Sequence, residues 1–354
     1  MNNNYFIHFG CWNNGGCPKE NDLTKVLNAI NKLTTKPDFL TVCGDNYYPT
    51  VVKTNKDKKK YLKNEDLQSG FQCLPNDIPI YMTYGNHDFE TGLFINENDR
   101  ENNCTLTKDE IFMVSNEFSN INLKLFQSIS FNDNTLILLI DTTIYDEDSI
   151  DEYINCYSQV DAKYSSIDVI KNEQLKFIEM FANKVKTNNN VKNVIIVGHH
   201  PLAQFKMKKD SLMFYVLSNE LNDLLYNTLF LEERNLNYYY LCADLHQYQS
   251  GTVTINNMTI KQYIVGTAGA KKDSLNKDLL FTTPQSLDNL QYFMDETDRE
   301  SSSNKNGYLK CQHNGVNMLF EFIEVNTVRG GRKTKRRIRR RKITKRKYSN
   351  KKID

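Results

Sequence analysis

Four short hydrophobic runs along the chain each end in polar residues of the kind that bind metal ions. The runs cover residues 39–43, 78–82, 194–197 and 238–242, and they lead into Gly44-Asp-Asn-Tyr-Tyr48, Gly85-Asn-His-Asp88, Gly198-His-His-Pro201 and Ala243-Asp-Leu-His246. Apolar runs of this length, bounded by turn residues, are typical of buried strands. The carboxyl ends of parallel strands meet at one edge of a sheet, so we expect the four polar segments to meet there.

Between these runs, hydrophobic residues recur at the three- and four-residue spacing of amphipathic helices. Three such faces lie in residues 23–33, 174–185 and 221–231, and residues 5–9 form a first strand before them. Three further β-type runs follow without helices between them, at residues 252–255, 259–265 and 316–325. The alternation of strand and helix predicts an α/β fold.

Four segments show no clear period. We expect a loop and a helix in the Lys-rich residues 52–74, a polar segment over residues 89–125, a surface excursion over residues 146–164 and a long loop over residues 271–306. His8 and His313 lie outside the four polar segments. We interpret both as structural, and Asp141, at the end of the run 135–140, as a capping or supporting carboxylate.

The chain divides by charge into a body and a tail. The 354 residues carry 45 Lys and Arg and 43 Asp and Glu, a net charge of +2. The body, 1–328, has 30 basic and 42 acidic residues, a net charge of −12, whereas 329–354 has 15 basic residues and one acid. Almost no apolar residue lies in the tail, so we predict one folded domain over 1–328 and a disordered basic tail over 329–354.

The tail has several interpretations. Lys and Arg at this density bind polyanions by counterion release, with nucleic acid first and an anionic membrane second. A nuclear localisation signal and a merely solvated tail are the alternatives. The Gly-Gly followed by basic residues also resembles the ends of proteins encoded by large DNA viruses.

Other features of the sequence indicate an intracellular protein. The N-terminus has no charged region followed by a long apolar stretch, and no run reaches the roughly 18 apolar residues that span a bilayer. The eight Cys form no CxxC pair, and Cys43 and Cys242 lie within apolar runs. We therefore expect reduced thiols and a cytoplasmic protein, with the nucleus or a virus particle as alternatives.

The order of the four polar segments resembles the calcineurin-like metallophosphoesterase superfamily, and within it most closely the tartrate-resistant, purple acid phosphatases. The resemblance runs from about Tyr5 to Val325 and includes Trp12, Asp141 and the Gly266–Ala270 turn. It implies a four-layer α/β/β/α sandwich with two metal ions, of Fe, Zn or Mn. It also implies that phosphomonoesters are hydrolysed by attack of a metal-bound hydroxide.

The resemblance implies a role for each matched residue. Asp45 would bridge both ions, Tyr48 and His246 would bind the first ion, and Asn86 and His199 the second. His87 would act in catalysis by stabilising the transition state or protonating the leaving oxygen. His200 would contact the phosphate, and Asp88 would orient His87 or a ligand.

Two positions depart from the family pattern. Cys11 stands where the family has an Asp ligand of the first ion, and Asp244 where it has a His ligand of the second. Thiolate and carboxylate both bind divalent metals, so we expect Cys11 and Asp244 to be ligands, with a structural buried thiol as the alternative for Cys11. The alternative functions are a degenerate pseudo-phosphatase that acts as a scaffold or binding protein, and a body carried by a nucleic-acid-binding tail.

Overall fold

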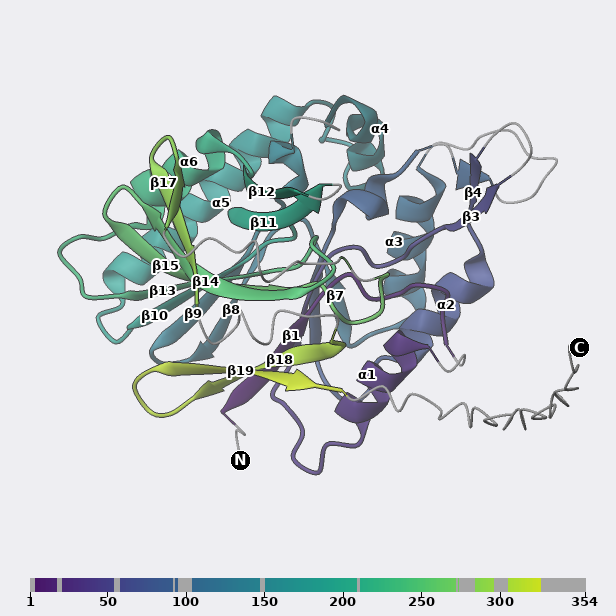
Figure 1. The fold of residues 1–354 in the computed structure, drawn as a ribbon, viewed down its shortest axis with the longest axis horizontal. Coiled ribbons are helices and arrows are strands. Elements are labelled where there is room, and N and C mark those ends of the chain that lie inside the picture. Colours follow the sequence, from purple (N-terminus) through teal and green to yellow (C-terminus); the bar gives the residue numbers. More distant parts are fainter. Residues whose placement is uncertain are drawn as a thin grey trace, which may run out of the picture.

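Two large β-sheets form the centre of the molecule (Figure 1). The computed structural model describes residues 4–17, 21–53, 58–91, 93–94, 104–146, 150–208, 211–271, 273, 284–295 and 305–325. The first sheet has six strands, in the order β19 (Met318–Glu324), β18 (Gly307–His313), β1 (Tyr5–Phe9), β2 (Leu40–Cys43), β5 (Ile80–Thr83) and β7 (Ile121–Leu123). Strands β1, β2, β5 and β7 run parallel, and β18 and β19 add an antiparallel edge.

The second sheet has eight strands and a parallel centre. Its order is β16 (Gln285–Leu287), β17 (Leu290–Met294), β14 (Tyr248–Ile255), β15 (Met258–Val265), β13 (Asn237–Cys242), β10 (Asn193–Val197), β9 (Thr135–Leu139) and β8 (Gln127–Asn132). Strands β9, β10, β13 and β15 run parallel. All five residues of β10 are buried, as expected for a strand that is covered on both faces.

Helices cover the outer faces of the two sheets. Figure 1 shows α5 (Ile167–Thr187) and α6 (Asn219–Leu229) beside the eight-stranded sheet, and α1 (Asp22–Asn31) and α2 (Asn64–Gln72) beside the six-stranded sheet. Two more helices, α3 (Thr105–Glu117) and α4 (Ile150–Val160), pack against each other. Helix α1 begins where the Asn21 side chain accepts a hydrogen bond from the Thr24 amide at 2.8 Å, a regular N-cap.

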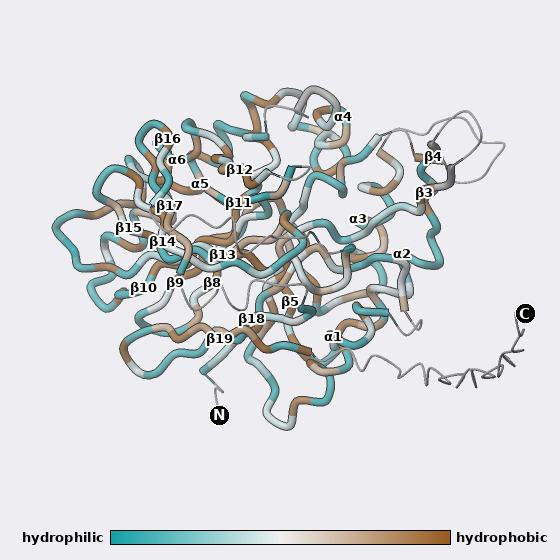
Figure 2. Tube along the Cα trace, in the orientation of Figure 1, coloured by the Kyte–Doolittle hydropathy of each residue, from teal (hydrophilic) through white to brown (hydrophobic). Residues whose placement is uncertain are grey.

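The alternation of side chains along β10 accounts for the layers. Ile195 and Val197 join the core that also holds residues of β1, β2 and α1, whereas Val194 and Ile196 join the core under α5 and α6. Successive strand residues point to opposite faces, so β10 lies between two apolar layers. In Figure 2 the hydrophobic colour follows the inner strands, and the hydrophilic colour is concentrated in loops. The predicted α/β/β/α order is confirmed.

Smaller elements surround the strand ends. A two-stranded hairpin consists of β11 (Ala203–Lys208) and β12 (Ser211–Val216), and a small sheet consists of β3 (Thr50–Lys53), β4 (Lys58–Tyr61) and β6 (Leu93–Phe94). Two 3₁₀ helices follow strands of the large sheets, η1 (Asn86–Phe89) and η2 (Thr143–Tyr145). The expected loop and helix over 52–74 therefore contains strand as well as helix α2.

The prediction of a surface excursion over 146–164 is wrong. This segment contains α4, in which Tyr153, Cys156 and Tyr157 are buried. The Tyr157 ring stacks on Phe89 of η1 with centroids 4.1 Å apart. Aromatic burial of this kind has no simple period in the sequence, because the contacts are made by a few large rings rather than by a regular apolar stripe.

The expectation of eight reduced cysteines is also wrong, because Cys104 and Cys156 form a disulfide across 52 residues. The packing of α3 against α4 brings the two sulfurs together, and neither helix was predicted. The remaining six cysteines are free: Cys11, Cys17, Cys43, Cys73, Cys242 and Cys311.

Several segments differ from the expected loops, or lie outside the described residues. Strands β16 and β17 lie within the long loop expected over 271–306, and β18 was not predicted. The basic tail from residue 329 lies outside the described residues, so its predicted disorder and polyanion binding stay predictions. No helix in the described part of the chain is long and apolar enough to cross a membrane.

Candidate metal centre

The carboxyl ends of five parallel strands bring the predicted ligands together. Strands β1, β2, β5, β10 and β13 lead respectively into the segments that carry Cys11, Asp45, Asn86, His199, and both Asp244 and His246. Among the described residues, two groups of possible metal-binding side chains form, and within each group the ligand atoms all lie within 4.8 Å of one another. One group is Cys11, Asp45 and His246, and the other is His199, His200 and Asp244.

The backbone at these strand ends turns sharply. Cys11, Asp45 and Asp244 have φ angles of 51°, 52° and 50°, in the left-handed region that few residues other than glycine adopt. Such a conformation costs roughly 1 kcal/mol or more per residue and is found most often at functional sites. Gly44 allows a further close approach, because a Cβ there would lie 2.7 Å from His199 Nδ1. These three residues are all predicted ligands; the same backbone conformation also occurs outside the site, at Asn4, Cys104, Asn256 and Asp288.

The Oδ2 atom of Asp45 faces the first group. The Tyr48 hydroxyl donates a hydrogen bond to it at 2.6 Å, and the Cys11 thiol donates one at 3.6 Å. The hydroxyl oxygen of Tyr48 also lies 3.0 Å from His246 Nε2. Oxygen, sulfur and nitrogen donors therefore converge on one side of the Asp45 carboxylate.

The Oδ1 atom of Asp45 faces the second group. It lies 3.3 Å from His199 Nε2, and it accepts a hydrogen bond from the His87 amide at 3.1 Å. Asn86 Oδ1 lies 3.1 Å from the same nitrogen of His199. Asp45 is therefore placed between two sets of ligand-type atoms, with one carboxylate oxygen toward each.

The histidine hydrogen bonds show that both groups fit a cation. His199 Nδ1 lies 2.7 Å from the Cys43 carbonyl, and His246 Nδ1 lies 2.7 Å from the Lys271 carbonyl. A carbonyl only accepts, so Nδ1 carries a hydrogen in both rings, and in the neutral form that binds a metal Nε2 would present a lone pair to the site. In that form the lone pair of His199 Nε2 would face the Asp45 carboxylate, which is also an acceptor. A cation between such acceptors would relieve their repulsion, and this donor set suits Zn, Fe or Mn.

Electrostatics at the first group depend on whether a cation is bound. Burial raises the pKa of the Cys11 thiol well above its ordinary value, and the Asp45 carboxylate raises it further. For Asp45, burial opposes ionisation, but the positive charges of His199 and His87 in their protonated forms outweigh it and hold the pKa of Asp45 below its usual range. Without a cation the site therefore holds a neutral thiol beside a carboxylate, and a bound metal would favour the thiolate.

His200 differs from His199 because its Nε2 atom presents a hydrogen, rather than a lone pair, to its surroundings. The Thr142 hydroxyl oxygen accepts hydrogen bonds from the backbone amides of His199 at 3.1 Å and His200 at 2.9 Å, and it lies 3.1 Å from His200 Nδ1. With its two acceptor positions filled, the hydroxyl donates its hydrogen to Nδ1. Burial lowers the pKa of His200 to about 4, so the ring is neutral and its Nε2 carries the hydrogen. His200 is thus arranged as a hydrogen-bond donor.

His87 has an acidic partner that the sequence analysis missed. Its Nδ1 lies 2.5 Å from Glu90 Oε1, which also accepts a hydrogen bond from Lys60 at 2.8 Å. Burial lowers the pKa of His87, but Asp45 and Glu90 outweigh it and raise the pKa to about 9. The i+3 spacing from His87 was the only sequence signal for Glu90, whereas Lys60 lies on β4, which was not predicted.

Asp88 holds two loops together rather than orienting His87. It accepts hydrogen bonds from the Gly85 and Asn46 amides, each at 2.7 Å, and from the Asn46 side chain at 3.0 Å. Burial and the neighbouring Asp45 raise the pKa of Asp88 to about 7. Asp88 therefore fixes the loop that carries Asn86 against the loop that carries Asp45.

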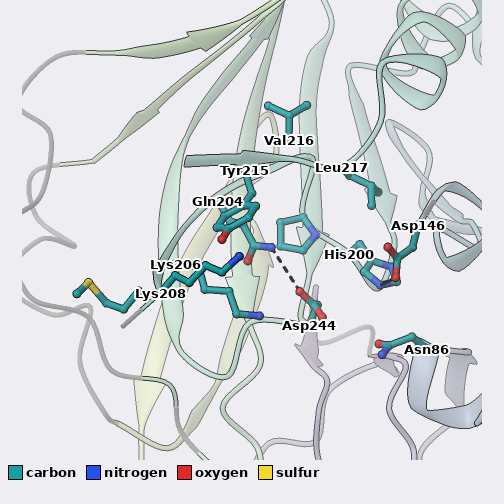
Figure 3. Close-up of a pocket in the computed structure, with 12 residues that line it drawn as sticks. Asn86, Asp146, His200, Gln204, Lys206, Lys208, Tyr215, Val216, Leu217 and Asp244 are labelled. Atoms are coloured by element: carbon teal, nitrogen blue, oxygen red, sulfur yellow. Dashed lines mark hydrogen bonds and ion pairs between the residues drawn. The ribbon is translucent and has the colours of Figure 1, made fainter. Parts of the chain in front are cut away.

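A pocket of about 520 Å³ opens beside the second group (Figure 3). Asn86, His200 and Asp244 line its inner part, together with Asp146, whose carboxylate lies 3.9 Å from His200 Nε2. Residues of the β11–β12 hairpin line the opposite side. The pocket thus connects the candidate metal centre with solvent.

The two-sheet sandwich, with ligand-type side chains gathered at its strand ends, defines a protein of the metallophosphoesterase class. The model of the calcineurin-like phosphoesterase family matches residues 5–266, and the chain belongs to this family.

Curated relatives match only a short part of the chain. It is 33% identical over 82 residues to the serine/threonine-protein phosphatase CPPED1 of Bos taurus, which is 22% of this chain and 25% of that protein. Against CPPED1 of Homo sapiens, the identity is 32% over 85 residues, or 22% of this chain and 26% of that protein. The chain thus spans about a quarter of the length of these relatives.

Two solved structures are similar over most of the chain. "Structure of PhoD" has a TM-score of 0.49 and 10% identity, and covers 92% of this chain and 72% of that one. "GAP50 the anchor in the inner membrane complex of Plasmodium" has a TM-score of 0.46 and 12% identity, and covers 91% and 85%.

Proposed function

We propose that this protein is a phosphomonoesterase that uses two metal ions. The observation that carries the proposal is the position of Asp45, whose two carboxylate oxygens each face a separate set of ligand-type atoms. Cys11, Tyr48 and His246 would hold the first ion, and Asn86, His199 and Asp244 the second, with Asp45 between them. The sulfur at the first position favours a zinc-like divalent ion over the ferric ion of purple acid phosphatases.

Two bound cations would supply Lewis acidity that activates water and neutralises charge on the phosphoryl group. The chain's own residues complete the arrangement. The Nε2–H of His200 can donate to a phosphoryl oxygen in the pocket. Held as a cation by Asp45 and Glu90, His87 can donate a proton to the leaving oxygen. The Glu90 carboxylate keeps the His87 ring in position for that transfer.

The test is hydrolysis of phenyl phosphate by protein that has been stripped of metal and reloaded with Zn²⁺, Mn²⁺ or Fe²⁺. We expect phosphate release with at least one ion, and a loss of about a thousandfold in Asp45→Asn. Asp77→Asn is the matched control, because it removes an exposed carboxylate. Equal activity of Asp45→Asn and wild type would refute the proposal.

The alternative is a pseudo-phosphatase in which Cys11 and Asp244 have ended catalysis. The double variant Cys11→Asp/Asp244→His distinguishes the two. If the parent is inert and the variant is active, the chain is a degenerate relative. If the parent is active and the variant is weaker, the substituted ligands belong to a working site. The placement of both side chains within the two ligand groups favours the second outcome.

A further inference from the structure

The β11–β12 hairpin places two lysines on the wall of the pocket. Along β11, Ala203 and Phe205 are buried, whereas Gln204 and Lys206 are half-buried and Lys208 is exposed. Strand residues two apart share a face, so Gln204, Lys206 and Lys208 lie in one row. All three line the pocket, and the row begins beside the candidate metal centre, where Gln204 Nε2 donates to Asp244 Oδ2 at 3.5 Å.

The inner face of β11 is fixed to the eight-stranded sheet. Gln262 Oε1 accepts a hydrogen bond from the Leu202 amide at 2.9 Å, and Gln262 Nε2 donates to the Ala203 carbonyl at 2.6 Å. Gln249 Nε2 donates to the Phe205 carbonyl at 2.7 Å, and its Oε1 accepts from the Phe205 amide at 3.3 Å. These buried contacts fix the start of the strand, so the lysines extend from a fixed base.

The lysines lie across the pocket from the candidate phosphate contacts. In Figure 3, Lys206 and Lys208 are on one side, His200 and Asn86 are on the other, and Asp244 is between them.

Charge is unevenly distributed in the pocket. Its two carboxylates, Asp146 and Asp244, are at the end of the candidate metal centre, where Asp146 faces His200 and Asp244 belongs to a ligand group. Within the described ranges, no carboxylate forms an ion pair with Lys206 or Lys208. Two cationic groups on the wall of one pocket, with no ion pair to a carboxylate in the described part of the chain, form a site that favours an anion.

We propose that Lys206 and Lys208 form a second anion-binding subsite, so that the substrate is a phosphomonoester whose remaining part carries a second anionic group. This inference rests on the proposed function, since it takes the phosphoryl group to be bound at the metal end. The reactive phosphoryl group would lie between Asn86 and His200, and the second anion would lie against the lysine row. The subsite would accept a carboxylate or a second phosphate.

The test uses three aryl phosphates that differ at the para position: phenyl phosphate, para-carboxyphenyl phosphate and hydroquinone bisphosphate. Phosphate release gives kcat/KM for wild type and for Lys206→Gln/Lys208→Gln. We expect wild type to prefer the doubly anionic substrates, and the variant to lose at least about fivefold more kcat/KM on them than on phenyl phosphate. Lys184→Gln/Lys186→Gln, at the end of α5, is a control of equal charge that should retain the preference.

The ratio of kcat/KM between substrates tests this inference separately from the proposed function. A preference for the bisphosphate alone identifies a second phosphate as the ligand, and an equal preference for the carboxylate identifies a general anion site. The inference is overturned if wild type shows no preference, or if the preference survives in Lys206→Gln/Lys208→Gln. If wild type hydrolyses none of the substrates, the proposed function fails. Calorimetry with the corresponding phosphonates then tests the subsite by the same comparison of wild type with the variant.

Discussion

The thiol of Cys11 donates a hydrogen bond to Asp45 Oδ2 across 3.6 Å, in a fully buried contact between the loops that follow β1 and β2. Both residues adopt the left-handed backbone conformation. The contact places the sulfur on the same carboxylate oxygen that Tyr48 contacts. A thiol that had only filled core space would not need to share this oxygen, so the contact favours a ligand role.

The first prediction concerns this sulfur. Cys11→Ser should weaken metal binding at the first position by about tenfold or more, because a hydroxyl is a much poorer anionic ligand than a thiolate. Cys11→Asp should retain metal but shift the preference away from zinc-like ions. Competition with a chelator measures both affinities. Cys311→Ser, which changes a buried thiol outside the site, is the control, and equal zinc affinity in Cys11→Ser and wild type would contradict the ligand role.

The second prediction concerns the partner of His87. Glu90→Gln should lower kcat by about tenfold to a hundredfold with little change in KM, because it removes the carboxylate that orients the imidazole without touching the phosphate. Lys60→Met leaves the contact between His87 and Glu90 in place and should therefore lower kcat less than Glu90→Gln does. Steady-state kinetics on phenyl phosphate measure both variants. A rise in KM at constant kcat in Glu90→Gln would show that Glu90 acts in substrate binding instead.

The third prediction concerns stability at acid pH. His8 is fully buried between the sheets, and burial lowers its pKa from 6.5 to about 3. The unfolded chain takes up a proton at His8 in this range while the folded chain does not, so stability is lost as pH falls. The contribution is about 1.4 kcal/mol per pH unit between pH 6.5 and 3.

His8→Gln keeps a polar side chain near Thr41 Oγ1, which lies 3.0 Å from His8 Nδ1, but cannot titrate. Urea unfolding at several pH values should therefore show a shallower loss of stability below pH 6.5 in the variant. Parallel curves for the variant and wild type would show that His8 does not contribute to acid lability.

The fourth prediction concerns the disulfide. Cys104 and Cys156 close a loop of 52 residues and join α3 to α4, both of which pack on η1. Cys104→Ser/Cys156→Ser should lower the free energy of unfolding by about 2 to 4 kcal/mol, because the unfolded chain gains entropy. Cys73→Ser is the matched control for a free cysteine. Urea unfolding without reductant measures both, and equal stability of all three proteins would contradict the prediction.

Much of the fold could be predicted because the central strands carry a strong local signal. β10 is apolar in four of five positions, and α5 repeats its buried positions at helical spacing, so both elements were expected, although α5 begins seven residues before the expected helix. The residues of the candidate metal centre were found from the same signal, since they come directly after strands of this kind.

The elements that were missed depend on contacts distant in sequence. α4 is held by the stacking of Tyr157 on Phe89 and by the disulfide. Neither contact produces a periodic hydrophobic pattern in the sequence. β18 becomes a strand by pairing with β1, about 300 residues earlier in the chain. The pairing of His87 with Glu90 and the lysine row of β11 likewise became visible only when the strand ends and the hairpin were placed in space.

The measurement that tests the central claim most directly is the elemental metal content per chain of wild type and Asp45→Asn, purified without chelator. Asp45 contacts both ligand groups, so the account predicts close to two ions per chain in wild type and about one or fewer in the variant. Asp77→Asn should match wild type. A wild-type protein without metal, or an Asp45→Asn variant that retains the full wild-type content, would contradict the account.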